Sequence, residues 1–115
     1  MSSSSDDHSS GSNVNRRRVA DLCAVFGSLP RWQIIDILRR SGGKNIKTLA
    51  KSLGLSHTAA SQHVKILRAA GVVEAVLVDQ DDPRLTHQRL SEKRLVTDGE
   101  GKQWLDFGQV KICLD

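Results

Sequence analysis

The stretch LGLSHTAASQHVKILRAAG, residues 53–71, decides the fold because it contains the signals that start and stop a helix. A serine N-cap and a closing glycine predict a helix over about residues 57–70. On that helix the small and aliphatic residues fall on one side, and Thr58, Gln62 and Lys65 fall on the other. The sequence therefore predicts an amphipathic helix whose polar side becomes basic toward its end.

Three more helices are predicted ahead of it from apolar residues that recur every three or four positions. Only Gly54 to Ser56 separate the third predicted helix from the fourth, so the two helices must cross steeply. We expect Gly54 to adopt a left-handed backbone conformation that a side chain would disfavour. The pattern is that of a helix-turn-helix, and its first three helices are residues 16–28, 30–40 and 46–53.

Beyond Gly71 the composition becomes strand-like and rich in valine. A strand, a polar segment with an Asp82-Pro83 turn and a second strand predict a β wing, and a terminal strand follows. Thr97 and Glu100 fit a capping box for one more short helix, and a long hairpin over 87–114 without that helix is the alternative. The expected fold is mainly α with a small β wing, a winged helix-turn-helix, with strands at 72–79, 94–97 and 109–115.

The length of 115 residues allows one domain, which we place at residues 16–115. Residues 1–15 are rich in Ser and Asp and hold too few large apolar residues to order themselves, so we expect a disordered tail. No apolar run is long enough for a membrane span and no signal peptide is apparent, which predicts a cytoplasmic protein. Cys23 and Cys113 are expected to be reduced thiols that form no redox switch.

Positive charge is concentrated in the first half of the predicted domain. Residues 16–68 contain eleven Lys and Arg against two Asp, a net charge of +9, whereas residues 69–115 carry a net charge of −3. Such asymmetry is typical of nucleic-acid-binding proteins, although a solvated helical surface gives the same composition.

The predicted fourth helix supplies the groups that a helix in the DNA major groove requires. Hydrogen-bonding side chains near its start can reach base edges, and cations further along can contact phosphates. The candidate base contacts are His57, Thr58, Ser61 and Gln62, and the candidate phosphate contacts are Lys47, Lys65, Arg68, Arg84 and Arg89.

The segment IKTLAKSLGLSHTAASQHVKILRAAGVVEA resembles the winged helix-turn-helix of ArsR-type regulators, which show a similar LAxxLGLSxxxxSxHxxxLxxAGxV pattern. The resemblance implies a homodimer that binds double-stranded operator DNA and represses transcription, paired through terminal elements such as residues 16–28 and 104–114. The positions that match are Leu49, Ala50, Leu53, Gly54, Leu55, Ser56, Ser61, His63, Leu67, Ala70, Gly71 and Val73.

The chain also departs from that family. The cysteines of the thiolate metal-sensing motif are absent from NIKTLAKS, and His57 and His63 do not share a helix face. We therefore assign no metal site and no cofactor, and the small-molecule effector, if there is one, is unknown. His63 is interpreted as a packed or phosphate-touching residue. The wing is longer than usual, and QVKICLD stands where the family has a dimerisation helix.

Other functions are less well supported by the residues. No catalytic set of Ser, His and Asp or of Cys and His lies at a plausible spacing, and no glycine loop for phosphates is present, so an enzyme is not expected. RNA modules rely on exposed aromatic side chains, of which this chain has few. The main alternative is a winged helix that binds another protein and not DNA.

Overall fold

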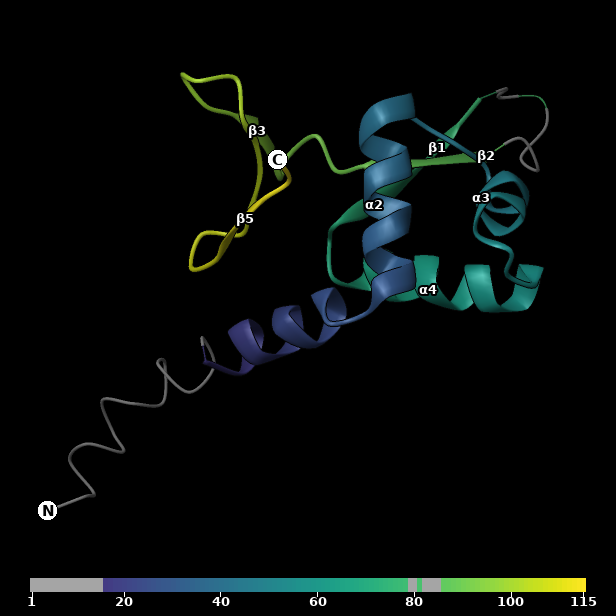
Figure 1. Ribbon diagram of the computed structural model, residues 1–115, viewed down its shortest axis with the longest axis horizontal. Coiled ribbons are helices and arrows are strands. Elements are labelled where there is room, and N and C mark those ends of the chain that lie inside the picture. Colours follow the sequence, from purple (N-terminus) through teal and green to yellow (C-terminus); the bar gives the residue numbers. More distant parts are fainter. Residues whose placement is uncertain (1–15, 79–80, 82–85) are drawn as a thin grey trace, which may run out of the picture.

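The computed structural model describes residues 16–78, 81 and 86–115, which form a helical body with two small sheets. Residues 16–26 are helical and are followed by α2 (Leu29–Ser41), α3 (Ile46–Leu53) and α4 (His57–Ala69). In Figure 1, α2 stands at the centre, α4 crosses at its lower end, and α3 lies at the opposite side from the C-terminal sheet. The predicted tail, the Asp82-Pro83 turn and Arg84 lie outside the described residues.

Short-range hydrogen bonds explain where the helices begin. The side chain of Ser28 caps α2, which has Pro30 in its first turn, and the side chain of Asn45 accepts the backbone N–H of Thr48 at 2.8 Å to cap α3. Ser56 caps α4 by accepting the backbone N–H of Ala59 at 3.1 Å. Each predicted helix up to residue 70 is thereby confirmed.

The turn between α3 and α4 depends on one backbone conformation. Gly54 has φ 66° and ψ 29°, the left-handed region that the sequence predicts for it. Its backbone N–H closes α3, and the N–H of Leu55 donates to the carbonyl of Ala50 at 2.9 Å. This turn lets α4 start at once in a new direction.

The wing is an antiparallel pair of β1 (Val73–Leu77) and β2 (Thr86–Leu90), with Val73 opposite Leu90. Lys44 forms an isolated bridge with Gln88 and so joins the wing to the start of α3. The first strand agrees with the prediction over 72–79, but the prediction of 94–97 as its partner is wrong. The true partner, THQRL, has the polar Gln88 at a buried position, which hides its alternation.

Residues 95–115 form a sheet and contain no helix. Strands β3 (Leu95–Thr97), β4 (Gln103–Asp106) and β5 (Lys111–Cys113) pair antiparallel in that order. The predicted helix near 98–107 is therefore wrong, and so is the long hairpin over 87–114, whereas the terminal strand is confirmed. Asp98 is the reason, because its carboxylate accepts the backbone N–H groups of Glu100 and Lys102 at 2.9 and 3.0 Å and closes a turn.

One apolar core joins the helices to both sheets. Phe107, just after β4, packs edge-on against Phe26 with ring centroids 6.1 Å apart, and the guanidinium of Arg94 lies 5.2 Å from the Phe107 ring centroid. No helix in the described part of the chain is both long and apolar enough to cross a membrane. The core residues are Leu22, Phe26, Ile34, Ile35, Leu38, Leu49, Val64, Leu67, Val72, Val73, Leu90, Leu105 and Phe107.

Candidate nucleic-acid interface

Helix α4 has one buried side and one exposed side, as the sequence predicts. Ala60, Val64 and Leu67 are fully buried against the rest of the domain. Thr58 and Gln62 are exposed on the opposite side. The buried side fixes the orientation of α4, so the polar side chains are presented to solvent along its whole length.

The exposed side chains of α4 are free to bind something else. Within the described residues, the side chains of Thr58, Gln62, Lys65 and Arg68 make no hydrogen bond and no ion pair. The first turn of α4 contains no acidic residue, and Arg68 lies in its last turn. The helix therefore offers hydrogen-bonding groups at its start and uncompensated cations further along.

His57 and Ser61 lie one turn apart on the same helix and contact each other. Ser61 Oγ is 3.4 Å from His57 Nδ1, and Ser61 is only half-exposed. Both remain candidate base contacts, but Ser61 is the less accessible of the predicted set.

His63 lies against Arg31, which fits the interpretation of a packed residue. It is half-buried, and its Nδ1 lies 3.3 Å from Nη1 of Arg31. The same guanidinium donates to the carbonyl oxygens of Val25 at 2.6 Å and Ala24 at 3.1 Å. Arg31 therefore connects the end of the helix over 16–26 to α4. In the sequence, Arg31 was counted only as one of the cations of the basic half, and this structural role was not predicted.

A cavity of about 320 Å³ lies where α3, α4 and the wing meet. The tight turn at Gly54 brings Lys47 of α3 and His57 of α4 to the same cavity, two residues that the sequence places in different roles. Sequence reasoning missed the wing residues of this cavity because the second wing strand was expected elsewhere. The lining residues are Asn45, Ile46, Lys47, His57, Thr86 and Gln88.

The predicted phosphate contacts on the wing are less available than those on the helices. Arg89 is half-buried and ion-paired, with Nη2 2.6 Å from Glu74 Oε2 and Nη1 3.3 Å from Glu92 Oε1. Because two carboxylates already neutralise this guanidinium, its remaining attraction for a phosphate is small. Lys47, Lys65 and Arg68 are the predicted phosphate contacts that the described residues leave uncompensated.

Metal ligands do not gather in the described part of the chain, where no group of three or more His, Cys, Asp or Glu is placed to hold an ion. Cys23 is exposed and Cys113 is half-buried, and both are free thiols.

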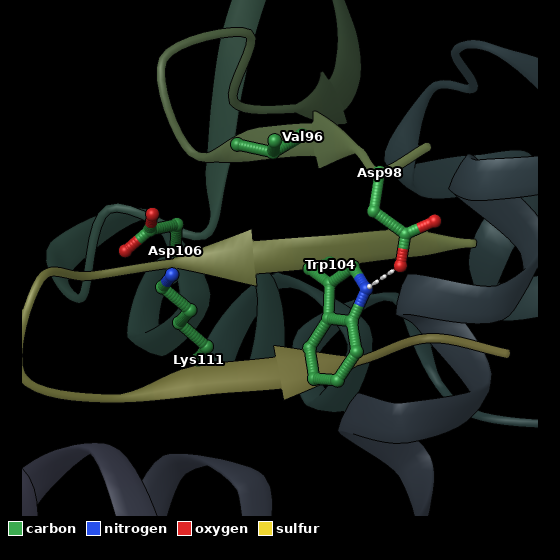
Figure 2. Close-up of a pocket in the computed structure, with 5 residues that line it drawn as sticks. All are labelled: Val96, Asp98, Trp104, Asp106 and Lys111. Carbon is green, nitrogen blue, oxygen red and sulfur yellow. Dashed lines mark hydrogen bonds between the residues drawn. The ribbon is translucent and has the colours of Figure 1, made fainter. Parts of the chain in front are cut away.

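A second cavity of about 320 Å³ lies on the outer face of the C-terminal sheet, lined by Val96, Asp98, Trp104, Asp106 and Lys111 (Figure 2). The Trp104 indole N–H donates to Asp98 at 2.9 Å, and this bond is the largest cause of a lowered pKa for the Asp98 carboxyl. Because the Asp98 and Asp106 carboxylates both accept backbone N–H groups of neighbouring turns, their first role is structural.

Comparisons with known proteins identify the fold. A model of the MarR family matches residues 28–84, and no curated protein matches the sequence. Reduced HlyU from Vibrio cholerae N16961 is 26% identical, with a TM-score of 0.58 over 71% of this chain and 81% of its own.

Two more solved structures share the fold at lower identity. YusO from Bacillus subtilis is 12% identical, with a TM-score of 0.53 over 77% of this chain and 65% of its own. FabT from Streptococcus pneumoniae, solved in complex with DNA, is 19% identical, with a TM-score of 0.52 over 78% of this chain and 66% of its own.

These comparisons confirm the winged helix-turn-helix fold and the predicted class of function. The matching family model is that of the MarR family, so the ArsR type stays a prediction. The chain is a winged helix-turn-helix protein of the DNA-binding transcriptional regulator class, and its segment 28–84 matches the MarR family.

Proposed function

We propose that this protein represses transcription by binding operator DNA as a homodimer, with α4 as the recognition helix in the major groove and the wing beside the adjacent minor groove. The observation that carries the proposal is the exposed side of α4, which changes from uncharged polar to basic along the helix and has no partner among the described residues. Thr58 and Gln62 would contact bases, with His57 and Ser61 beside them, and Lys65 and Arg68 would contact phosphates.

The neighbour solved with DNA supports this orientation. FabT has the same fold and was solved in complex with DNA. Because the fold is shared over 78% of this chain, we expect α4 to have a counterpart in FabT at the same place in the fold. We extend the same proposal to a cytoplasmic location and to Lys47 as a phosphate contact.

The proposal also includes that the protein forms a homodimer and that it is of the ArsR type. A single winged helix covers one half-site, so tight operator binding needs two copies. The helix over 16–26 and the segment 104–114 are the terminal elements proposed to pair. Light scattering at micromolar protein should report a dimer, and a monomer that protects only half-sites would contradict this part.

The test of the base contacts starts by selecting an operator from a randomised DNA library. Gln62→Ala should then weaken operator binding by ~1–3 kcal/mol, because a glutamine can pair bidentately with adenine, and should leave binding to random DNA nearly unchanged. Gln33→Ala is the matched control, since Gln33 is an exposed glutamine on α2.

Three outcomes separate the candidate functions. A loss on the operator alone for Gln62→Ala supports recognition by α4. Equal losses on operator and random DNA show that α4 does not read sequence. If the protein binds neither selected nor random DNA, the proposed function fails and the alternative, a winged helix that binds another protein, is favoured.

A further inference from the structure

The cavity between α3, α4 and β2 is lined by the first residues of two helices, Ile46 and Lys47 of α3 and His57 of α4. The N-caps satisfy the third N–H of each helix, that of Thr48 in α3 and that of Ala59 in α4. The first two N–H groups of each helix have no intrahelical partner. Neither helix has an acidic residue in its first turn, so both positive dipole ends remain uncompensated.

Side chains around the cavity add to this positive character. Lys47 is exposed and makes no ion pair with a described residue, and His57 stands opposite it at the first position of α4. None of the residues that line the cavity is acidic. The donors and the cation together select an anion.

Gln88 shows that the cavity lacks a partner. The residue is 2% exposed, and its Oε1 is buried without a hydrogen-bond donor. A buried carboxamide oxygen without a donor is uncommon, because it loses its hydrogen bonds to water and gains none. A hydrated anion supplies what is missing, since a bound water can donate to Oε1, or the turned amide can donate to the anion itself.

The location of the cavity indicates which anion it takes. In Figure 1, α3 and the wing strands lie at the same end of the molecule as the start of α4. A DNA duplex that holds α4 in its major groove and the wing beside the next minor groove must pass one backbone strand between them. The cavity lies at that crossing, because its lining joins the start of α4 to β2 of the wing.

We propose that this cavity is the seat of one DNA phosphodiester, bound by the starts of α3 and α4, by Lys47 and His57, and by Gln88 from below. The inference rests on the proposed function and adds to it Gln88, which no predicted set contained, and one phosphate shared by Lys47 and His57, which were predicted for different roles. It assigns Gln88 a positioning role at the floor of the seat. A single phosphate fixed there sets the register of α4 in the groove.

The first test combines methylphosphonate scanning of the operator with two lysine variants. A methylphosphonate removes the charge of one phosphate, so one backbone position should weaken wild-type binding by about threefold to tenfold and should have no effect on Lys47→Met. Lys51→Met is the matched control, because Lys51 lies on the same helix, is exposed and does not line the cavity. It should keep the wild-type sensitivity at every position.

Two results would overturn the seat. One is that no backbone position loses its effect in Lys47→Met. The other is that Lys47→Met and Lys51→Met respond alike. If operator binding still depends on Gln62 in either case, the proposed function stands and only the seat is rejected; if no DNA is bound at all, the proposed function itself fails.

The second test uses Gln88→Leu, which removes the unpaired carboxamide oxygen and keeps a buried apolar side chain of similar volume. We expect the melting temperature of the free protein to be unchanged or raised, because an unsatisfied polar group is lost, while DNA binding weakens severalfold on operator and random DNA alike. A variant that melts earlier and binds DNA normally would contradict the positioning role.

Inorganic phosphate distinguishes a DNA backbone from a free ligand. The NMR signals of the backbone amides of Ile46 and His57 should shift on addition of operator DNA. With inorganic phosphate at constant ionic strength, the shifts should keep growing through the millimolar range and reach no plateau. Saturable binding of phosphate in the micromolar range would reassign the cavity to a free anion and overturn the seat.

Discussion

Arg31 is expected to hold the helix over 16–26 onto the rest of the domain. Its Nε donates to the carbonyl of Val25 at 2.6 Å, its Nη2 donates to the carbonyl of Ala24 at 3.1 Å, and its Nη1 lies 3.3 Å from His63 Nδ1. The last carbonyls of a helix have no intrahelical donor, and a cation beside them also interacts favourably with the helix dipole. The guanidinium fork satisfies two of these carbonyls at once.

The size of the effect follows from these bonds. A hydrogen bond from a charged donor contributes ~1.5–3 kcal/mol, and the bond to Ala24 lies at an exposed edge, so we take the lower end for both. Arg31→Ala should then lower the free energy of unfolding by about 3 kcal/mol, or roughly 12–24 °C in melting temperature for a domain of this size. Arg31→Lys can keep only one bond and should cost about half as much.

Urea denaturation and amide hydrogen exchange together check this expectation. Arg40→Lys is the control, since Arg40 makes an exposed pair with Asp36 at 3.1 Å, a type of contact that contributes ~0.3–0.5 kcal/mol. Exchange in residues 16–26 should accelerate in Arg31→Lys and stay unchanged in Arg40→Lys. If the two variants lose the same small stability and exchange alike, the argument for Arg31 is refuted.

Outcomes are expected for four further variants. Gly54→Ala should lower the free energy of unfolding by ~1–2 kcal/mol in urea denaturation, because an added Cβ would meet no atom within 4 Å and only the left-handed backbone is disfavoured; a neutral substitution would contradict this. Lys65→Ala should flatten the slope of log affinity against log salt by about 0.9 per bound chain, measured by fluorescence anisotropy. Arg89→Ala should leave that slope nearly unchanged because Glu74 already pairs with it at 2.6 Å, so equal slopes for the two variants would count against the assignment. Asp98→Asn should lower the melting temperature near neutral pH, and the difference from wild type should shrink below about pH 4. The reason is that the pKa of Asp98 is lowered in the folded state, so its stabilisation is present above the unfolded pKa and is lost as the pH falls through the folded pKa; a difference that does not change with pH would show that the charge is not involved.

The helices could be predicted from the sequence because their signals are local. The caps Asn45 and Ser56 bond to backbone N–H groups three residues away, and the stop at Gly54 is a property of one residue. The buried side of α4 follows from the same short-range periodicity. These interactions depend little on the rest of the chain, so sequence reasoning recovers them.

Strands β3 and β5 lie within the predicted strands 94–97 and 109–115, but β4 was missed because two local signals compete just before it. Thr97 and Glu100 have the spacing of a capping box, but Asp98 lies between them and captures the backbone N–H of Glu100 and of Lys102. The resulting turn feeds β4, whose Leu105 pairs with Leu95 and Ile112 across the sheet. That pairing depends on residues distant in sequence, which a capping pattern does not register.

The candidate site shows the same division between local and distant information. The exposed residues of α4 are read directly from its periodicity, whereas the state of each cation depends on partners far along the chain. Arg89 meets Glu74 fifteen residues away, and Arg31 meets His63 thirty-two residues away. Neither contact has a signature in the sequence, so the set of free cations could not be derived from it.

Because several of these cations bind groups of the same chain, the net charge of residues 16–68 overstates the number of cations available to DNA. The arginines of α2 already bind oxygens of the same chain: Arg31 binds carbonyls and Arg40 binds Asp36, which the net +9 over residues 16–68 already counts. Only Arg39 gains a carboxylate from outside that range, Asp115, so the guanidinium groups of α2 are engaged before DNA arrives although the net charge changes little. The predicted phosphate contacts left free on α3 and α4 are Lys47, Lys65 and Arg68. Three such contacts correspond to a salt slope of about −2.7 per bound chain, whereas nine would correspond to about −8. A slope near the smaller value means that sequence-independent attraction is modest, and that the uncharged side chains at the start of α4 must then supply most of the preference for the operator.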